Sequence, residues 1–208
     1  MRTDQAFSFA VLSLCIGACA KSDKSSVADT VHITNIGRPQ VDTAAANTAP
    51  MTFSLSSSAF AANGSIPTKY TCEGPGISPP LAWSGAQAGT KSYALIVEDP
   101  DAPDPAKPTR VVSHWVAYNI PASTTALAEN ASKTGMPAGS AQGSNERVTQ
   151  GYMGPCPPIG RHRYFFRLFA LDTQLQGVNN PKEADLDKAI QGHIVGTAEL
   201  IGTYQKTK

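Results

Sequence analysis

The stretch 92–121 alternates apolar and polar positions with a period of two. Such alternation predicts two β-strands, each of which buries one face. The buried face of the first strand would carry Tyr93, Leu95, Val97 and Asp99, and that of the second would carry Val112, His114, Val116 and Tyr118. Each strand therefore places one polar group, a carboxylate or an imidazole, in line with an apolar face.

A third strand with the same alternation follows residue 160. One face would carry His162, Tyr164, Phe166, Leu168 and Ala170, and the other Arg163, Phe165, Arg167 and Phe169. Shorter runs predict strands at 53–55, 66–72 and 81–83, with a turn at Asn63-Gly64. Many short strands separated by turns favour an all-β sandwich or barrel with minor helices.

One segment near the C-terminus, 181–191, has the apolar spacing of a helix instead. It starts with proline, places Glu183 and Asp185 in its first turns, and ends before Gly192. Residues 122–151 are rich in Gly, Ala, Ser, Thr and Asn. They predict a long surface loop, which is either part of a site or only a variable connector.

The strands that carry polar groups are flanked by two proline-rich loops. The segment 99–105 has three prolines in seven residues, which restrict the backbone and predict a loop that is shaped before any ligand arrives. The segment 154–158 leads into the third long strand. The candidate side chains in these regions are Asp99, Asp101, His114 and His162.

These candidates have a functional and a structural interpretation. In the functional interpretation they form part of a site, where the imidazoles would supply N–H donors and Asp99 would fix the tautomer of one ring and raise its proton affinity. In the structural interpretation, the aspartates start turns and His114 is a core histidine with satisfied hydrogen bonds. The repetition of the arrangement in two stretches favours a site.

Six motifs resemble those of the phosphatidylethanolamine-binding proteins, also called Raf kinase inhibitor-like proteins, and most closely their bacterial branch. The motifs are SPPLAW (78–83), DPDAP (99–103), HWVAYNIP (114–121), GPCPP (154–158), HRYFFRLFALD (162–172) and GHIVGTAELIGTY (192–204). The motifs occur in the order found in the family, and the resemblance extends over about residues 51–208. The resemblance implies a mainly β fold, a phosphatidylethanolamine-binding-protein-like β-sandwich with a few short helices, one of them near the C-terminus.

The resemblance also implies a ligand pocket. The residues around it would be Asp99, Asp101, His114, His162 and Tyr164, with Ala102, Pro103, Gly154 and Pro157 on the rim. Its ligand would be a phosphate-bearing or other anionic small molecule, such as a phospholipid head group. The family name further implies a partner kinase or protease, and a homodimer stays open.

A hydrolase or transferase that uses His114, Asp99 and His162 in acid–base catalysis is the alternative function. However, the chain has no G-x-S-x-G, no H-E-x-x-H and no P-loop lysine, so no catalytic residue, metal ligand or cofactor is predicted. The formal net charge is +1, with Lys and Arg interspersed among Asp and Glu. Nucleic acid is therefore not a predicted partner.

The first 50 residues differ from the rest of the chain. An apolar run at 6–18 is too short to span a bilayer but suits a secretory signal, and it ends in Ile16-Gly17-Ala18-Cys19, which resembles the lipobox of bacterial lipoproteins. We predict a lipoprotein signal peptide at 1–18, a flexible tether at 19–50 and the domain at 51–208. An ordinary signal peptide is the alternative.

The predicted lipoprotein would carry its lipid on Cys19. Because Ala20 rather than Asp follows, we expect anchoring in the outer membrane of a cell envelope, at the periplasmic face or the cell surface. The resemblance places Cys72 and Cys156 near the pocket. Export to an oxidising compartment permits a disulfide between them, but similar cysteines occur in family members thought to be cytosolic, so the sequence leaves both states open.

Overall fold

The computed structural model describes residues 52–207. The predicted signal peptide at 1–18, the tether at 19–50 and the lipidation site Cys19 lie outside the described residues. Within residues 52–207, no helix is both long enough and apolar enough to cross a membrane.

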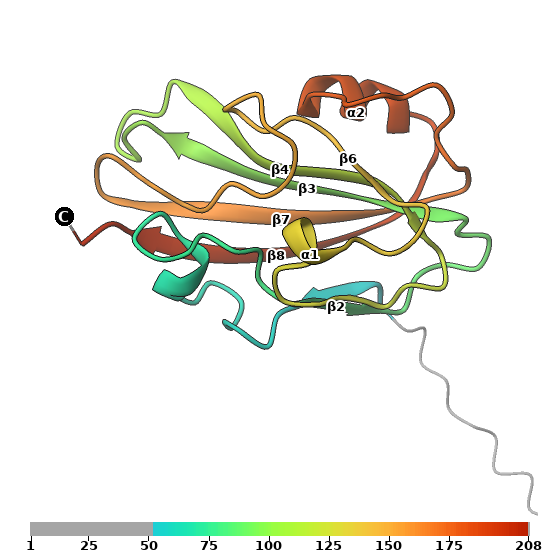
Figure 1. Ribbon diagram of the computed structural model, residues 1–208, viewed down its shortest axis with the longest axis horizontal. Coiled ribbons are helices and arrows are strands. Elements are labelled where there is room, and N and C mark those ends of the chain that lie inside the picture. The colour runs from blue at the N-terminus through green and yellow to red at the C-terminus, as the bar shows by residue number, and fades with distance from the viewer. Residues whose placement is uncertain (1–51, 208) are drawn as a thin grey trace, which may run out of the picture. The chain divides into compact units, whose positions relative to one another are not determined.

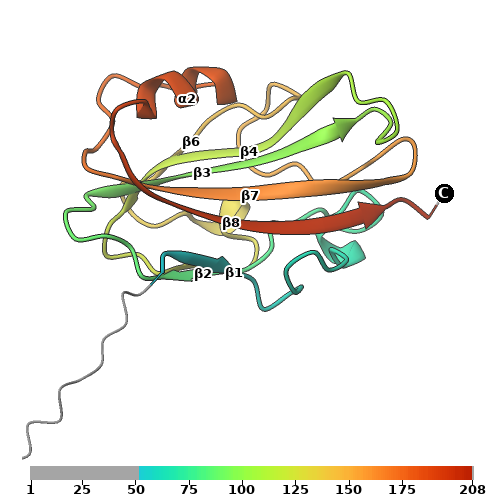
Figure 2. The same cartoon turned by 180° about the vertical axis from the view of Figure 1, so that it is seen from behind.

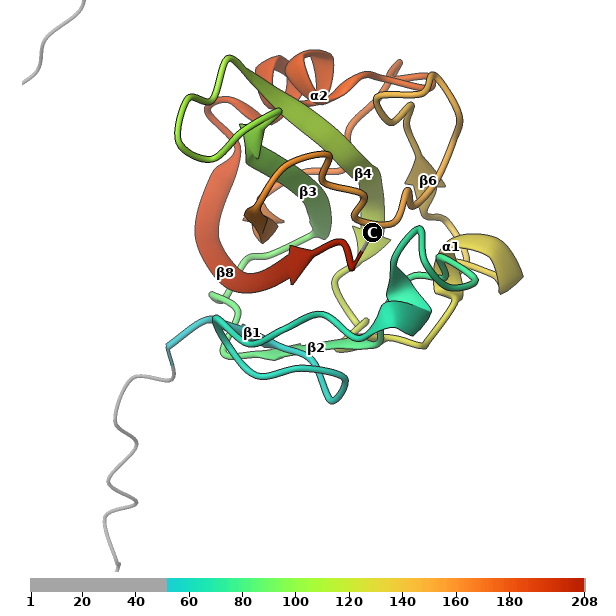
Figure 3. The same ribbon diagram turned by 90° about the vertical axis from the view of Figure 1, so that its left-hand side faces the viewer.

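Two antiparallel sheets make up the fold (Figure 1). The larger sheet has the strand order β6-β4-β3-β7-β8, with bounds Ala141–Gln142, Arg110–Pro121, Ser92–Ala102, Arg161–Leu171 and Ile194–Gln205. The smaller sheet has the order β1-β2-β5, with bounds Ser54–Ser56, Leu81–Ser84 and Ala126–Leu127. The two sheets face each other, as Figure 3 shows end-on. The predicted β-sandwich is therefore confirmed.

The main core fills the space between the sheets. Tyr93 of β3 stacks on Phe53 with ring centroids 6.1 Å apart, and it meets Trp83 of β2 edge-on at 5.5 Å. The predicted inner face of β7 also lies in this core, where Phe166 and Leu168 are fully buried. Aromatic burial on this scale is a dominant stabilising term in a domain of this size.

The predicted C-terminal helix is confirmed as α2, Glu183–Ile190. It covers the face of the large sheet that points away from the small sheet (Figure 2). Leu186 and Ile190 are buried there against Ala94 and Ile96 of β3. At its centre, the large sheet is thus covered by apolar side chains on both faces. Polar side chains are found instead near the ends of its strands.

A β-bulge in β4 changes the predicted face of His114. Val97 of β3 pairs with Trp115, but the next residue, Glu98, pairs with Ser113, so His114 is the extra residue on β4. Such a bulge breaks the alternation of side chains. The prediction that His114 shares a face with Val116 and Tyr118 is therefore wrong: Val116 and Tyr118 pack under α2, whereas His114 lines a cavity with Asp99.

Three further predictions about local structure are corrected. The segment 66–72 contains a 3-10 helix, Thr68–Tyr70, because Pro67 interrupts an extended ladder. The segment 122–151 is not one surface loop, since it forms β5, β6 and a short helix α1, Ala131–Thr134, anchored by buried Leu127 and Ala131. The predicted loop at 99–105 begins later, since β3 continues to Ala102. Pro100 is tolerated there because β3 pairs with β7 only as far as Glu98.

Candidate functional site

A cavity of about 280 Å³ lies where β3 ends and where β4 and β7 begin. It is lined by Asp99, Ala102, Pro103, Arg110, Val112, His114, Glu146, Arg147, Met153, Gly154, Cys156, Pro157, Pro158 and His162. All of the predicted ligand-binding residues except Asp101 and Tyr164 are in this set. Segments far apart in the sequence therefore converge as the motifs indicated.

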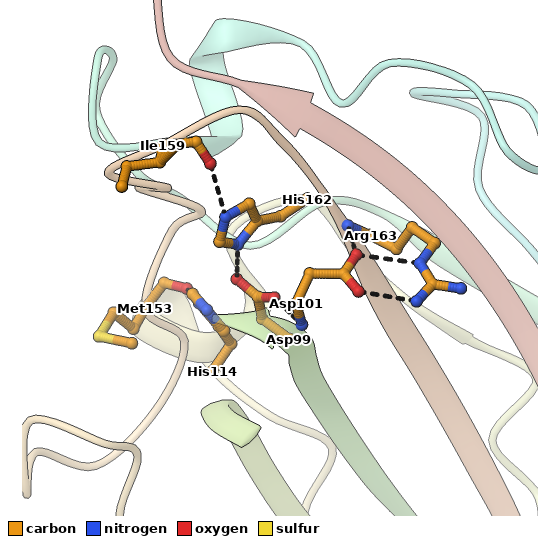
Figure 4. A network of polar contacts seen from close by, with 7 residues as sticks. All are labelled: Asp99, Asp101, His114, Met153, Ile159, His162 and Arg163. Carbon is orange, nitrogen blue, oxygen red and sulfur yellow. Dashed lines mark hydrogen bonds and ion pairs between the residues drawn. The ribbon is translucent and has the colours of Figure 1, made fainter. Parts of the chain in front are cut away.

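His162 and Asp99 form a buried pair at the wall of the cavity (Figure 4). His162 Nδ1 lies 2.8 Å from Asp99 Oδ2, and its Nε2 lies 2.9 Å from the carbonyl oxygen of Ile159. The carbonyl can only accept, so Nε2 carries a proton and donates it, and one proton is shared between Nδ1 and the carboxyl group of Asp99. The pair is therefore internally balanced in charge, and His162 has no N–H left for a ligand.

His114 is held in the opposite state. Its Nδ1 lies 2.7 Å from the carbonyl oxygen of Met153, so Nδ1 carries a proton and donates it. Burial lowers the pKa of His114, against the smaller raising effects of the Met153 carbonyl and Asp99. The ring is therefore neutral at pH 7, and its Nε2, which makes no hydrogen bond to any described residue, carries a lone pair.

Charged side chains stand at the mouth of the cavity. Arg110 pairs with Glu146 at 3.1 Å, and both side chains are exposed. The side chain of Arg147 lies beside them, also exposed, and makes no ion pair with a described residue. The mouth thus offers one unpaired cation within reach of solvent.

Asp101, although predicted as a ligand-binding residue, is not among the residues that line the cavity. Its carboxylate accepts three hydrogen bonds from Arg163: from the backbone N–H at 2.9 Å, from Nε at 2.9 Å and from Nη2 at 2.7 Å. These contacts lower the pKa of Asp101, with Arg163 as the main cause. Because Asp101 and Arg163 lie next to the Asp99–His162 pair in sequence, they fasten β3 to β7 beside the cavity.

Tyr164 does not line the cavity either. It is fully buried, and its ring meets the His114 ring edge-on with centroids 5.2 Å apart. Burial raises the pKa of its phenol, and the Asp99 carboxylate adds to the rise, although the hydroxyl lies outside hydrogen-bonding geometry with any described residue. Tyr164 therefore supports His114 from behind rather than contacting a ligand.

A disulfide between Cys72 and Cys156 closes one wall of the cavity, which answers the question that the sequence left open. The two Cα atoms are 5.4 Å apart. The wall is held further by a hydrogen bond from the Cys72 N–H to the carbonyl oxygen of Pro155, 3.0 Å long. Gly154 is needed in this wall, because a Cβ there would lie 2.9 Å from the carbonyl oxygen of Tyr70.

Sequence reasoning missed several lining residues, above all Arg147, Arg110 and Met153. Arg147 falls in the segment 122–151, where the only signal was the general association of long loops with function. Its position depends on Asn145, whose side chain accepts a hydrogen bond from the Arg147 N–H at 3.0 Å. Met153 contributes a backbone carbonyl, which no side-chain pattern can show.

Comparisons with known proteins agree with these motifs. The family model described as phosphatidylethanolamine-binding protein matches residues 56–205. A UPF0098 protein of Methanothermobacter thermautotrophicus is 50% identical over 153 residues, which are 73% of this chain and 98% of that protein. A UPF0098 protein of Chlamydia pneumoniae is 45% identical over 153 residues, covering 74% of this chain and 99% of that protein.

Two solved structures share the fold. YbcL of E. coli, described as a member of the mammalian PEBP family, is 34% identical with a TM-score of 0.69, covering 76% of this chain and 100% of that one. CT736 of Chlamydia trachomatis, described as a homolog of phosphatidylethanolamine-binding protein, is 42% identical with a TM-score of 0.67, covering 74% of this chain and 98% of that one. Both sequence and fold thus place residues 56–205 among these proteins.

Proposed function

The chain belongs to the phosphatidylethanolamine-binding protein family, whose fold is that of a ligand-binding module, and we propose that it binds a small anionic, phosphate-like head group in the cavity between His114 and Arg147. The observation that carries this proposal is the neutral His114 ring, fixed through Nδ1 with Nε2 unused, in a cavity that also holds an unpaired arginine. The guanidinium supplies charge and a planar pair of donors that match phosphate oxygens.

The two histidines have different roles in this proposal. His162 contributes shape, because the Asp99 carboxylate and the Ile159 carbonyl occupy both of its nitrogens. His114 is the ring that contacts the ligand. A phosphate monoester can donate its own proton to Nε2, whereas a diester needs Nε2 to gain a proton from solvent. In both cases the complex holds one proton between the anion and His114.

This proton couples binding to pH. In the free protein, burial lowers the pKa of His114. An anion beside the ring favours its charged form and raises that pKa in the complex. The complex therefore binds more protons than the free protein, and affinity should weaken as the pH rises through the pKa of His114 in the complex.

Titration calorimetry with glycerol 3-phosphate and glycerophosphoglycerol, which carry no ammonium group, tests the proposal. The first probe is a monoester and the second is the diester of a lipid head group, so the pair distinguishes a free phosphate source from a lipid one.

His114→Ala and Arg147→Ala should each weaken binding about tenfold or more, since each removes a charge-assisted hydrogen bond worth roughly 1.5–3 kcal/mol. Arg161→Ala, an exposed arginine outside the cavity lining, is the matched control and should bind normally. Unchanged binding by both cavity variants would exclude this site.

Acid–base catalysis is the second candidate, because a neutral, oriented imidazole with an open Nε2 has the features of a general base. None of the described residues that line the cavity offers a free hydroxyl or thiol, since Cys156 is in the disulfide. Catalysis would therefore have to activate water directly. Hydrolysis of a phosphodiester by the wild type that is lost in His114→Ala would favour this candidate over simple binding.

We also propose that the protein is lipid-anchored through Cys19 in the cell envelope. The support is the Ile16-Gly17-Ala18-Cys19 motif, together with a disulfide, which suits an oxidising compartment. Mass spectrometry of membrane-extracted protein should find a lipid-modified chain that starts at Cys19. Cys19→Ser should release the protein from the membrane fraction. A main product that retains Met1 or lacks lipid would contradict the anchor.

A further inference from the structure

A second hollow, of about 380 Å³, lies between β4, the segment 144–148 and the first turns of α2. It is lined by Val111, Ser113, Ser144, Asn145, Glu146, Val148, Lys182, Glu183, Ala184 and Asp187. It shares only Glu146 with the cavity at His114. Its volume falls within the usual range for ligand pockets, about 300–1,000 Å³.

The hollow holds two carboxyl groups that are not in direct contact with a cation. Glu183 and Asp187 make no ion pair with a described residue. The neighbouring acids do have partners: Glu98, on β3, pairs with Arg167 of β7, and Glu146 pairs with Arg110. Lys182 is the only cation in the lining, and its side chain is exposed. A positively charged group would therefore find free acceptors beside Glu183.

Ser113 is a second, independent indication of a ligand. Its side chain is only 9% exposed, it lines the hollow, and its Oγ makes no hydrogen bond to any described residue. The hydroxyl lies close enough to Glu183 to favour its ionised carboxyl and so to oppose the rise in pKa, although the two are outside hydrogen-bonding geometry. A buried hydroxyl without a partner costs free energy, which a bound donor would recover.

The rim of the hollow is apolar. Val111 and Val148 are 50% and 70% exposed, among the most exposed large apolar side chains of the described residues. Val148 also has a φ of 59°, a left-handed conformation that is unusual for a β-branched residue. Strain of this kind persists where the surrounding structure enforces it, and it is frequent at ligand-binding sites.

We propose that this hollow binds an alkylammonium group, the chemistry of a lysine side chain or of a free alkylamine. The three N–H donors of an ammonium match Glu183, Asp187 and the Ser113 hydroxyl. The methylene chain would lie against Val111 and Val148, as the stems of lysine side chains do on apolar surfaces. A metal ion fits less well, because the described residues contain no group of three His, Cys, Asp or Glu side chains with metal-binding geometry.

Binding should release a proton. Burial, followed by the nearby Glu98, raises the pKa of Glu183 to about 8, so that this carboxyl is mostly protonated at pH 7. Burial also raises the pKa of Asp187, while Arg167 opposes that rise. An ammonium ion favours the ionised carboxyl and displaces its proton. Affinity should therefore rise with pH until Glu183 is ionised in the free protein.

Titration of the protein with three probes tests the proposal: n-butylamine, Nα-acetyl-lysine amide and Nα-acetyl-norleucine amide. The first two carry the alkylammonium group, and the third has a similar stem without charge. Calorimetry should show binding of an ammonium probe that tightens about tenfold between about pH 6.5 and about pH 8.5, where both amines stay protonated. Equal binding of the norleucine probe, or no binding of either amine, would overturn the proposal.

Variants on α2 locate the site. Glu183→Gln should weaken ammonium binding about tenfold and remove its pH dependence, and Asp187→Asn should weaken it less. Asp185→Asn is the matched control, because Asp185 is exposed in the first turn of the same helix and does not line the hollow. Unchanged binding in Glu183→Gln would overturn the proposal. If the lysine probe binds at least as tightly as n-butylamine, the natural source is a polypeptide, and if only n-butylamine binds, it is a free amine.

Discussion

The N-terminal halves of β7 and of β4 each bury a histidine near Asp99, and the two rings differ in their hydrogen-bonding state. Both nitrogens of His162 are engaged, one by the carboxyl group of Asp99 and the other by the carbonyl oxygen of Ile159. His114 donates from Nδ1 alone and leaves Nε2 open. The residue type is the same, so the difference arises from the partners that surrounding segments supply. A histidine in a cavity wall is therefore a structural or a binding group according to what each of its nitrogens contacts.

Removal of His162 should have the largest effect on stability. His162→Ala leaves the buried carboxylate of Asp99 without its charge partner, and breaking a buried ion pair typically costs about 3–5 kcal/mol. Urea unfolding would measure the loss in free energy of unfolding. His193→Ala is the matched control: its pair with Asp172 is exposed on both sides, so it should cost less than about 1 kcal/mol. Equal losses would contradict the buried ion pair.

The protonation states behind this difference can be measured directly. In ¹⁵N NMR spectra of the imidazole side chains, His162 should show a protonated Nε2, because the carbonyl oxygen of Ile159 can only accept. His114 should show a protonated Nδ1 and a bare Nε2. A bare Nε2 on His162 would mean that this nitrogen does not donate to the Ile159 carbonyl in solution, and the contrast between the two rings would fail.

Loss of the disulfide should have the second largest effect on stability. It should also loosen the cavity wall that contacts His114. Cys72 and Cys156 are 84 residues apart in sequence, and a native disulfide that closes such a loop is worth about 2–4 kcal/mol. The double variant Cys72→Ser/Cys156→Ser should lose that amount in urea unfolding. It should also weaken the proposed phosphate binding, because the wall that carries Met153 loosens. Dithiothreitol treatment of the wild type should reproduce both effects, and an unchanged unfolding curve would contradict them.

Much of this contrast could be predicted from the sequence, because the period of two in β7 is unbroken. His162, Tyr164 and Phe166 are the buried residues at alternate positions of β7, as the alternation indicates. His114 could not be placed in the same way, since the bulge at Val97–Glu98 depends on the register between β3 and β4. Register is a property of two strands, and the pattern of one strand does not contain it.

The partners of the site were harder to predict than its central residues. Asp101 and Tyr164 belong to matching motifs, yet one turns to Arg163 and the other packs behind His114. Arg147 lies in a segment without periodicity, where local hydrogen bonds to Asn145 set the backbone. Motifs therefore identify which segments converge, whereas the direction of each side chain depends on contacts between segments.

The pair of Asp101 and Arg163 should contribute least, although it lies next to the Asp99–His162 pair. The Arg163 side chain is 56% exposed, and solvent screens its charge, so Arg163→Ala should cost only about 0.5–1 kcal/mol. Because Arg163 lowers the pKa of Asp101, this contribution is complete at neutral pH and is lost as the pH falls through the folded-state pKa. The difference in unfolding free energy between wild type and variant should therefore shrink below about pH 4. If Arg163→Ala lowered the free energy of unfolding as much as His162→Ala, the two pairs would act as one unit. The Asp101–Arg163 pair would then also hold the cavity together.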